Sequence, residues 1–176
     1  KCLWMIEDRP DWDSPNLDMA SRSFTSGGHL DVFRSDVEGR IGQMLMEIAE
    51  TKVDGILIQD DFVSRQFQDY KTNAWRSFNN QAFTWQNTRE LFDIDENRIR
   101  YKSRYYAWTR HKSRVLSAIL SRWVTRIQLV NPEVKIAVNL YYESVLSPHH
   151  ARLWLSQDLE DLMELPVDHW AIMAYQ

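Results

Sequence analysis

The sequence predicts an α/β fold, namely a parallel (β/α) TIM-type barrel present as a fragment that covers about four central strands in one domain (residues 1–176). Four short apolar runs alternate with stretches of helical periodicity, which is the order of a parallel sheet with right-handed crossovers. No glycine-rich phosphate loop follows any run, which disfavours a dinucleotide-binding or P-loop domain. A complete barrel needs ~200 residues or more, so this chain would supply about half of one. An open, flavodoxin-like sheet is the alternative.

The first part of the chain predicts two strands and one helix. Residues 3–6 (LWMI) are a short apolar run that predicts a buried strand, and residues 7–32 are polar, as in a long loop. Residues 35–52 predict a helix, because they start with a capping box (SDVE) and continue with apolar side chains at helical spacing. Residues 54–59 are largely apolar and β-branched, which predicts a strand covered on both faces.

The second part continues the alternation of strands and helices. Residues 61–98 are polar and rich in aromatic side chains, and we interpret them as an elaborated loop after the strand. Residues 103–130 carry one apolar stripe and predict a long helix that a proline ends. Residues 135–141 and 169–175 predict two further strands, with a helix over residues 148–163 between them.

The composition limits the classes of function. The net charge is −4 and the basic residues are scattered, which disfavours a nucleic-acid partner. The single cysteine, Cys2, excludes an internal disulfide framework, and the histidines lack metal-ligand spacing, so we expect no metal and no cofactor. No run approaches the ~20 apolar residues of a membrane span. The eight tryptophans suit both a core and the stacking of sugar rings.

Polar and aromatic side chains follow the predicted strands. In a parallel barrel the functional residues come from the carboxyl ends of the strands, which meet at one mouth. The pair Asp60 and Asp61 follows the strand at residues 54–59, and strand alternation allows only one of the two to face the mouth. The other can cap the following turn. The further candidates at strand ends are Glu7, Asn139, Tyr141, Tyr142, Glu143 and Tyr175.

This set of side chains fits the cleavage of a glycosidic bond. The reaction needs a proton donor beside the leaving oxygen and a second group that stabilises the oxocarbenium-like centre. Asp60 or Asp61 can be the donor if burial and the neighbouring charge raise its pKa. Glu143 or an N-acetyl group of the substrate can fill the second role, and the tyrosines can orient sugar hydroxyls or an acetamido group.

Three blocks of the sequence resemble the C-terminal glycoside hydrolase domain of PgaB-type proteins. They are residues 54–61 (DGILIQDD), 139–148 (NLYYESVLSP) and 171–174 (AIMA), and Trp4-Met5 resembles a Trp-Met pair on an earlier strand of that domain. The resemblance implies a (β/α) barrel that cleaves partially de-N-acetylated poly-β-1,6-N-acetylglucosamine, a biofilm polysaccharide. It also implies a fused polysaccharide deacetylase domain and a periplasmic or outer-membrane setting in a Gram-negative bacterium.

The resemblance assigns roles to individual residues. Asp60 and Asp61 match the acidic strand end of the PgaB-type domain, Glu143 matches a glutamate in its Asn-Leu-Tyr block, and Trp4 becomes a substrate-binding candidate. This sequence departs from the family at Gln59, where a histidine is common, and at Tyr175-Gln176, where Met-Ala is commonly followed by Met-Pro.

A second resemblance selects one acid of the pair. Residues 54–61 are similar to a degenerate form of the chitinase-superfamily strand, with Asp61 at the position of the proton donor. In that register residues 57, 59 and 61 share one face, which favours Asp61 over Asp60 as the inward acid. Three alternative functions remain open: a non-catalytic carbohydrate-binding barrel, a chitinase-like hydrolase of another N-acetylated polysaccharide, and a different barrel hydrolase, such as an α-glycosidase-like enzyme, with Glu143 as the second carboxylate.

Overall fold

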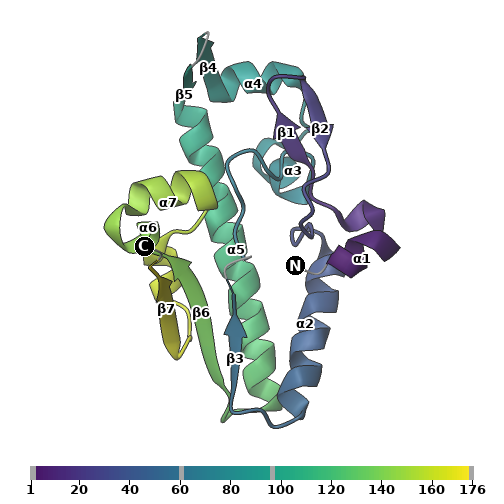
Figure 1. The fold of residues 1–176 in the computed structure, drawn as a ribbon, viewed down its shortest axis with the longest axis vertical. Helices are drawn as coiled ribbons and strands as arrows, with labels where there is room; N and C mark the ends of the chain where they lie inside the picture. The colour runs from purple at the N-terminus through teal and green to yellow at the C-terminus, as the bar shows by residue number, and fades with distance from the viewer. Residues whose placement is uncertain (1–2, 60–61, 96–97, 175–176) are drawn as a thin grey trace.

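A computed structural model gives the structure of residues 3–59, 62–95 and 98–174, without the side chains of residues 3 and 4 (Figure 1). In chain order the helices and strands are α1 (Leu3–Asp8), the 3-10 helix η1 (Pro10–Trp12), β1 (Asn16–Asp18), β2 (Ser23–Thr25), α2 (Ser35–Glu50), β3 (Gly55–Ile58), α3 (Asn73–Asn79), α4 (Trp85–Leu91), β4 (Phe92–Asp95), β5 (Arg98–Tyr101), α5 (Ser103–Val130), β6 (Lys135–Tyr141), α6 (Glu143–Leu146), α7 (Pro148–Leu155), α8 (Leu159–Met163) and β7 (His169–Met173).

The described residues form a parallel sheet of three strands, in the order β3-β6-β7. β3 pairs with β6 up to Ile58 and Val138, and β6 pairs with β7 up to Tyr141 and Met173. Helices separate the three strands along the chain. The helix α5 runs antiparallel to the strands, from beyond the carboxyl end of β3 back to the level of its amino end (Figure 1). The strands predicted near residues 54–59, 135–141 and 169–175 and the helix over 103–130 are confirmed.

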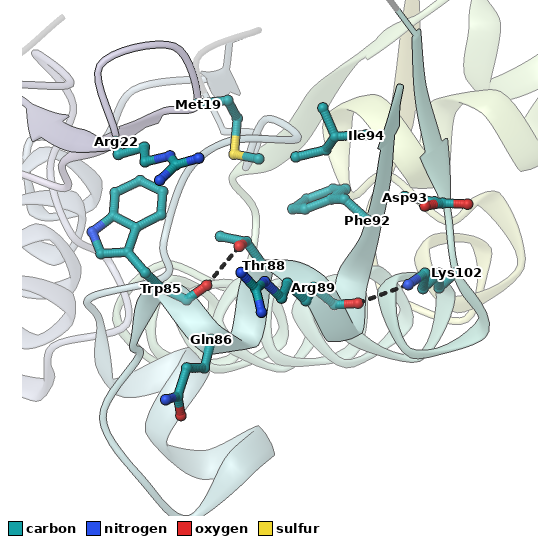
Figure 2. A pocket seen from close by; sticks show the side chains of 10 residues that line it. All are labelled: Met19, Arg22, Trp85, Gln86, Thr88, Arg89, Phe92, Asp93, Ile94 and Lys102. Carbon is teal, nitrogen blue, oxygen red and sulfur yellow. Dashed lines mark hydrogen bonds between the residues drawn. The ribbon is translucent and has the colours of Figure 1, made fainter. Parts of the chain in front are cut away.

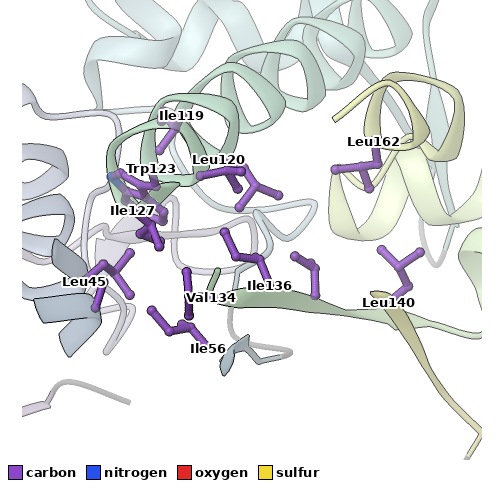
Figure 3. Close-up of a cluster of buried hydrophobic side chains, with 13 residues drawn as sticks. Leu45, Ile56, Ile119, Leu120, Trp123, Ile127, Val134, Ile136, Leu140 and Leu162 are labelled. Carbon is purple, nitrogen blue, oxygen red and sulfur yellow. The ribbon is translucent and has the colours of Figure 1, made fainter. Parts of the chain in front are cut away.

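One face of this sheet is covered and the other is open. Ile56, Val138 and Leu140 are buried against α2, α5 and α8 in the main hydrophobic cluster (Figure 3). On the opposite face Leu57 is 49% exposed, and Asn139 is only partly buried. We expected helices to cover both faces of β3. This expectation is wrong for the described residues, in which helices cover only one face of the sheet.

Residues 3–6 form part of the helix α1 and not a strand. Met5 is buried against Trp12 and Val37, and its carbonyl accepts a hydrogen bond from the N–H of Arg9 (3.0 Å). A run of four apolar residues does not distinguish strand from helix by periodicity, and leucine and methionine are good helix formers. The predicted set of four sheet strands is thus reduced to three within the described residues.

Two helix predictions need correction at their ends. The N-cap residue of α2 is Arg34 and no side chain caps it, because Ser35 lies inside the helix and Glu38 pairs with Arg122 (2.7 Å) instead of closing a capping box. The helix predicted over residues 148–163 is divided into α7 and α8. Ser156 has a left-handed backbone (φ 53°), which ends α7 before α8 begins.

The segment predicted as an elaborated loop contains α3, α4 and β4, and β4 pairs antiparallel with β5. These elements pack around the first half of α5 through an aromatic cluster that includes Tyr70, Trp75, Phe92 and Trp108, all at most 2% exposed. The rings of Trp75 and Trp108 are 5.2 Å apart in an edge-to-face arrangement. Aromatic side chains predicted from composition to suit sugar binding thus form a second core here.

Candidate functional site

The carboxyl end of β6 brings four of the predicted site residues together. Asn139 and Tyr141 lie two residues apart on the open face of the sheet, and Tyr142 and Glu143 follow directly. Because Ile58 pairs with Val138, Gln59 comes level with Asn139 across the sheet. The open face and the strand end therefore carry amide, phenol and carboxylate groups side by side.

Glu143 is the most unusual group at this end of the sheet. It is the first residue of α6, and its Oε2 atom is buried without a hydrogen-bond partner among the described residues. A buried carboxylate oxygen without a donor is rare, because its desolvation costs about 1–3 kcal/mol or more. Tyr142, beside it, is 41% exposed. The pair thus offers an unsatisfied acceptor next to an accessible phenol.

A buried glutamine holds the turn after β6 in place. The Oε1 atom of Gln157 accepts hydrogen bonds from the backbone N–H of Tyr141 (3.2 Å) and from the hydroxyl of Ser144 (2.7 Å). Both Gln157 and Ser144 are buried. This contact fixes the backbone on either side of Glu143, and sequence reasoning missed it because Gln157 lies in the break between α7 and α8.

Asp60 and Asp61 lie outside the described residues, but their neighbours in the chain line a cavity. Gln59 and Phe62 both contribute to this cavity of about 350 Å³ at the end of β3. The rest of its lining comes from β3, α2, α5, Val63 and the segment at residues 28–32, with Ile6 from α1. The residues before and after the acidic pair in the sequence therefore line one cavity, whose size is typical of small-ligand pockets (roughly 300–1,000 Å³).

Three other predicted residues are not brought into this group. Glu7 does not follow a strand; it is an exposed residue of α1, since the segment before it is helical. Only its neighbour Ile6 reaches the cavity at the end of β3. The side chain of Trp4 and the whole of Tyr175 lie outside the described residues.

A buried charged network fixes the loop that follows Asp61. Lys112 of α5 donates hydrogen bonds to the hydroxyl of Ser64 (2.8 Å) and to the carbonyl of Arg65 (2.9 Å). Ser64 in turn donates to Asp69, which also accepts a hydrogen bond from Ser14 (2.5 Å). The only sequence signal for this network was a lysine placed within the apolar stripe of the long helix.

Asp31 is a second titratable group that sequence reasoning did not identify. It is 6% exposed, and its Oδ1 atom accepts the N–H of Phe33 (3.1 Å). Burial, and secondly the charge of Asp69, raise the pKa of Asp31 to about 7. Asp31 lines a polar cavity of about 450 Å³ with Lys71 and Arg76, apart from the cavity beside Gln59.

This raised pKa predicts a pH-dependent stability. Between about pH 4 and pH 7 the folded chain holds a proton on Asp31 that the unfolded chain has lost, so stability falls as the pH rises through this window. We expect Asp31→Asn, which cannot titrate, to weaken this decline and to raise the free energy of unfolding near pH 8 by about 2 kcal/mol. Urea unfolding at several pH values measures it. Asp8→Asn, at an exposed site, should keep the wild-type slope, and an equal slope in Asp31→Asn would contradict the prediction.

The described part of the chain lacks two kinds of feature. No group of three or more His, Cys, Asp or Glu side chains is arranged there to hold a metal ion. Among the same residues, no helix has the length and apolar character that crossing a membrane requires.

One family model matches most of the chain. The model of the family GHL13, described as hypothetical glycosyl hydrolase family 13, matches residues 11–176. No curated protein matches the chain. The matched range includes β3, β6 and β7 and the strand ends described above.

Proposed function

The chain belongs to GHL13, the hypothetical glycosyl hydrolase family 13, and from this membership we propose that it is an endo-acting glycoside hydrolase. Its proposed substrate is partially de-N-acetylated poly-β-1,6-N-acetylglucosamine, the polymer implied by the resemblance to PgaB-type domains. The observation that carries the proposal is the end of β6, where Glu143, whose Oε2 atom is buried without a partner among the described residues, follows Asn139, Tyr141 and Tyr142 in the chain.

We also propose that the sheet β3-β6-β7 is part of a (β/α) barrel. Its strands are parallel, helices cover a single face, and the open face carries Asn139 and Tyr141. In a barrel the helix-free face is the interior, and the carboxyl ends of the strands form the site. The position of Asn139 and Tyr141 on the helix-free face supports this proposal.

The proposed reaction breaks the bond between the anomeric carbon and the glycosidic oxygen. Asp61 gives its proton to the leaving oxygen, and Asp60 is its neighbour, whose charge raises the pKa of that donor. Glu143 or the acetamido group of the substrate stabilises the anomeric centre, and water supplies the hydroxyl of the new reducing end. Asn139, Tyr141 and Tyr142 orient the sugar.

The setting of the protein follows from the polymer. A hydrolase of an exported polysaccharide works outside the cytoplasm, so we propose a periplasmic or outer-membrane location in a Gram-negative bacterium. A polysaccharide deacetylase domain in the same protein would supply the de-N-acetylated substrate.

An assay of polymer cleavage tests the proposed function. We expect the protein to release reducing-end oligosaccharides from partially de-N-acetylated poly-β-1,6-N-acetylglucosamine and to leave β-1,4-linked N-acetylglucosamine oligomers intact, because the linkage sets where the scissile oxygen lies. Reducing-sugar measurement and mass spectrometry of the products give the result. Binding of the polymer without any product would indicate a carbohydrate-binding domain, and cleavage of the β-1,4 oligomers alone would indicate a chitinase-like enzyme; either outcome overturns the proposal.

A further inference from the structure

A second cavity lies away from the sheet, between the β1–β2 hairpin, α4 and the β4–β5 ribbon. Its volume is about 580 Å³, and its lining contains no residue of β3, β6 or β7. Figure 2 shows Trp85 and Arg22 on one side, Phe92 and Ile94 on the other, and Arg89 between them. The cavity combines an aromatic ring with cationic groups, and the proposed cleavage reaction uses none of them.

Trp85 is held as a rigid platform. It is the first residue of α4, whose start is closed by a capping box between Thr84 and Asn87. The hydroxyl of Thr88 donates a hydrogen bond to the carbonyl of Trp85 (2.6 Å), as drawn in Figure 2. The indole also contacts the ring of Phe24, with a centroid distance of 6.0 Å. A half-buried, fixed indole is suited to pack against the apolar face of a pyranose ring.

The charge of the lining is positive. The lining contains three cationic side chains, Arg22, Arg89 and Lys102, and a single carboxylate, Asp93, which lies opposite Arg100 in the register of the β4–β5 ladder. The guanidinium groups of Arg22 and Arg89 have no ion pair or hydrogen bond with any described residue, whereas Lys102 donates to the carbonyl of Arg89 (2.8 Å). Unpaired guanidinium groups at a cavity favour a planar oxyanion, which they bind in bidentate fashion.

The lining also contains a left-handed backbone position and an exposed apolar side chain. Arg22 has a left-handed backbone (φ 53°), which costs roughly 1 kcal/mol for a residue other than glycine. Ile94 is a large apolar side chain that is 57% exposed. Both residues face the cavity, where a bound molecule would contact them.

We propose that this cavity is an accessory binding site for a saccharide that carries a carboxylate, such as a hexuronate unit. The sugar ring packs on Trp85 and against Ile94, and the carboxylate binds Arg22 and Arg89. A volume of about 580 Å³ accommodates a short oligosaccharide. Cationic glucosamine units are disfavoured there, because the lining is itself positive. The site is separate from the proposed cleavage reaction and does not depend on it.

Isothermal titration calorimetry with trigalacturonate tests the site. We expect saturable binding that weakens by about tenfold or more in Arg89→Gln, because one charge-assisted contact is lost. Trp85→Leu should weaken binding to a similar extent. Arg89 is exposed, so Arg89→Gln should fold normally even if Trp85→Leu disturbs α4. Circular dichroism checks the fold of both variants.

Matched controls separate this site from other surfaces and from the proposed hydrolase site. Arg40→Gln removes an exposed charge of α2, Trp154→Ala removes a 48% exposed indole of α7, and Asp61→Asn removes the proposed proton donor. All three should bind trigalacturonate as the wild type does. The proposal would be overturned if trigalacturonate did not bind, or if Arg89→Gln bound it as tightly as the wild type does. It would also be overturned if neutral N-acetylchitotriose or inorganic phosphate bound with the same affinity as trigalacturonate.

Discussion

Replacing Asp61 by asparagine is expected to lower the turnover of partially de-N-acetylated poly-β-1,6-N-acetylglucosamine by about 10²–10⁴-fold, with little change in KM. Asparagine has nearly the shape of aspartic acid but no acidic proton, so the sugar leaves as an unprotonated alkoxide. The interaction that is lost exists mainly in the transition state, which explains why turnover and not binding changes. Release of reducing ends at several substrate concentrations measures both constants.

Two matched variants give this prediction its specificity. Asp54→Asn makes the same chemical change at the exposed, amino-terminal side of β3 and should keep wild-type turnover. Asp60→Asn removes the neighbouring negative charge, which would lower the pKa of Asp61 and move the alkaline limb of the pH profile to lower pH. Unchanged oligosaccharide release by Asp61→Asn would reject Asp61 as the proton donor and leave the family membership intact.

The elements with long or strong patterns could be predicted from the sequence. The helix at residues 103–130 was predicted within its observed bounds, because the apolar stripe from Val115 to Ile127 leaves little ambiguity and a proline follows it. The strands β3, β6 and β7 were predicted because each is a continuous apolar, β-branched run between turns. These same strands place Asn139, Tyr141 and Glu143 at one edge, so that part of the candidate site followed from the sequence.

Tertiary contacts decided the remaining elements. Residues 3–6 are too few to show a period, and burial of Met5 against α2 stabilises them as a helix. The β4–β5 ribbon was missed because its two strands have four residues each and alternate charged residues with few apolar ones. The roles of Gln157 and Asp31 were missed for a similar reason, since their partners come from other segments of the chain.

Replacing Lys112 by methionine is expected to lower the free energy of unfolding by about 3 kcal/mol at pH 7, which is a fall in Tm of about 10 °C for a domain of this size. Methionine fills the space of the lysine stem but leaves the carbonyl of Arg65 without its donor and Asp69 without the nearby positive charge. Thermal and urea unfolding measure the loss. Arg110→Met, an exposed change on the same helix, should stay within about 0.5 kcal/mol of the wild type.

The pH dependence and a double variant separate the charge of Lys112 from its packing. Burial lowers the pKa of Lys112 from 10.5 to about 8, so between these values the unfolded chain holds a proton that the folded chain lacks. Wild-type stability should therefore rise with pH across that window, and Lys112→Met should lose the rise. Adding Asp69→Asn to Lys112→Met should cost less than the sum of the two single changes, by about 1–2 kcal/mol, because each charge compensates the other. Strict additivity would show that Lys112 acts through its hydrogen bonds alone, and that Asp69 is held by its serine donors without help from the lysine.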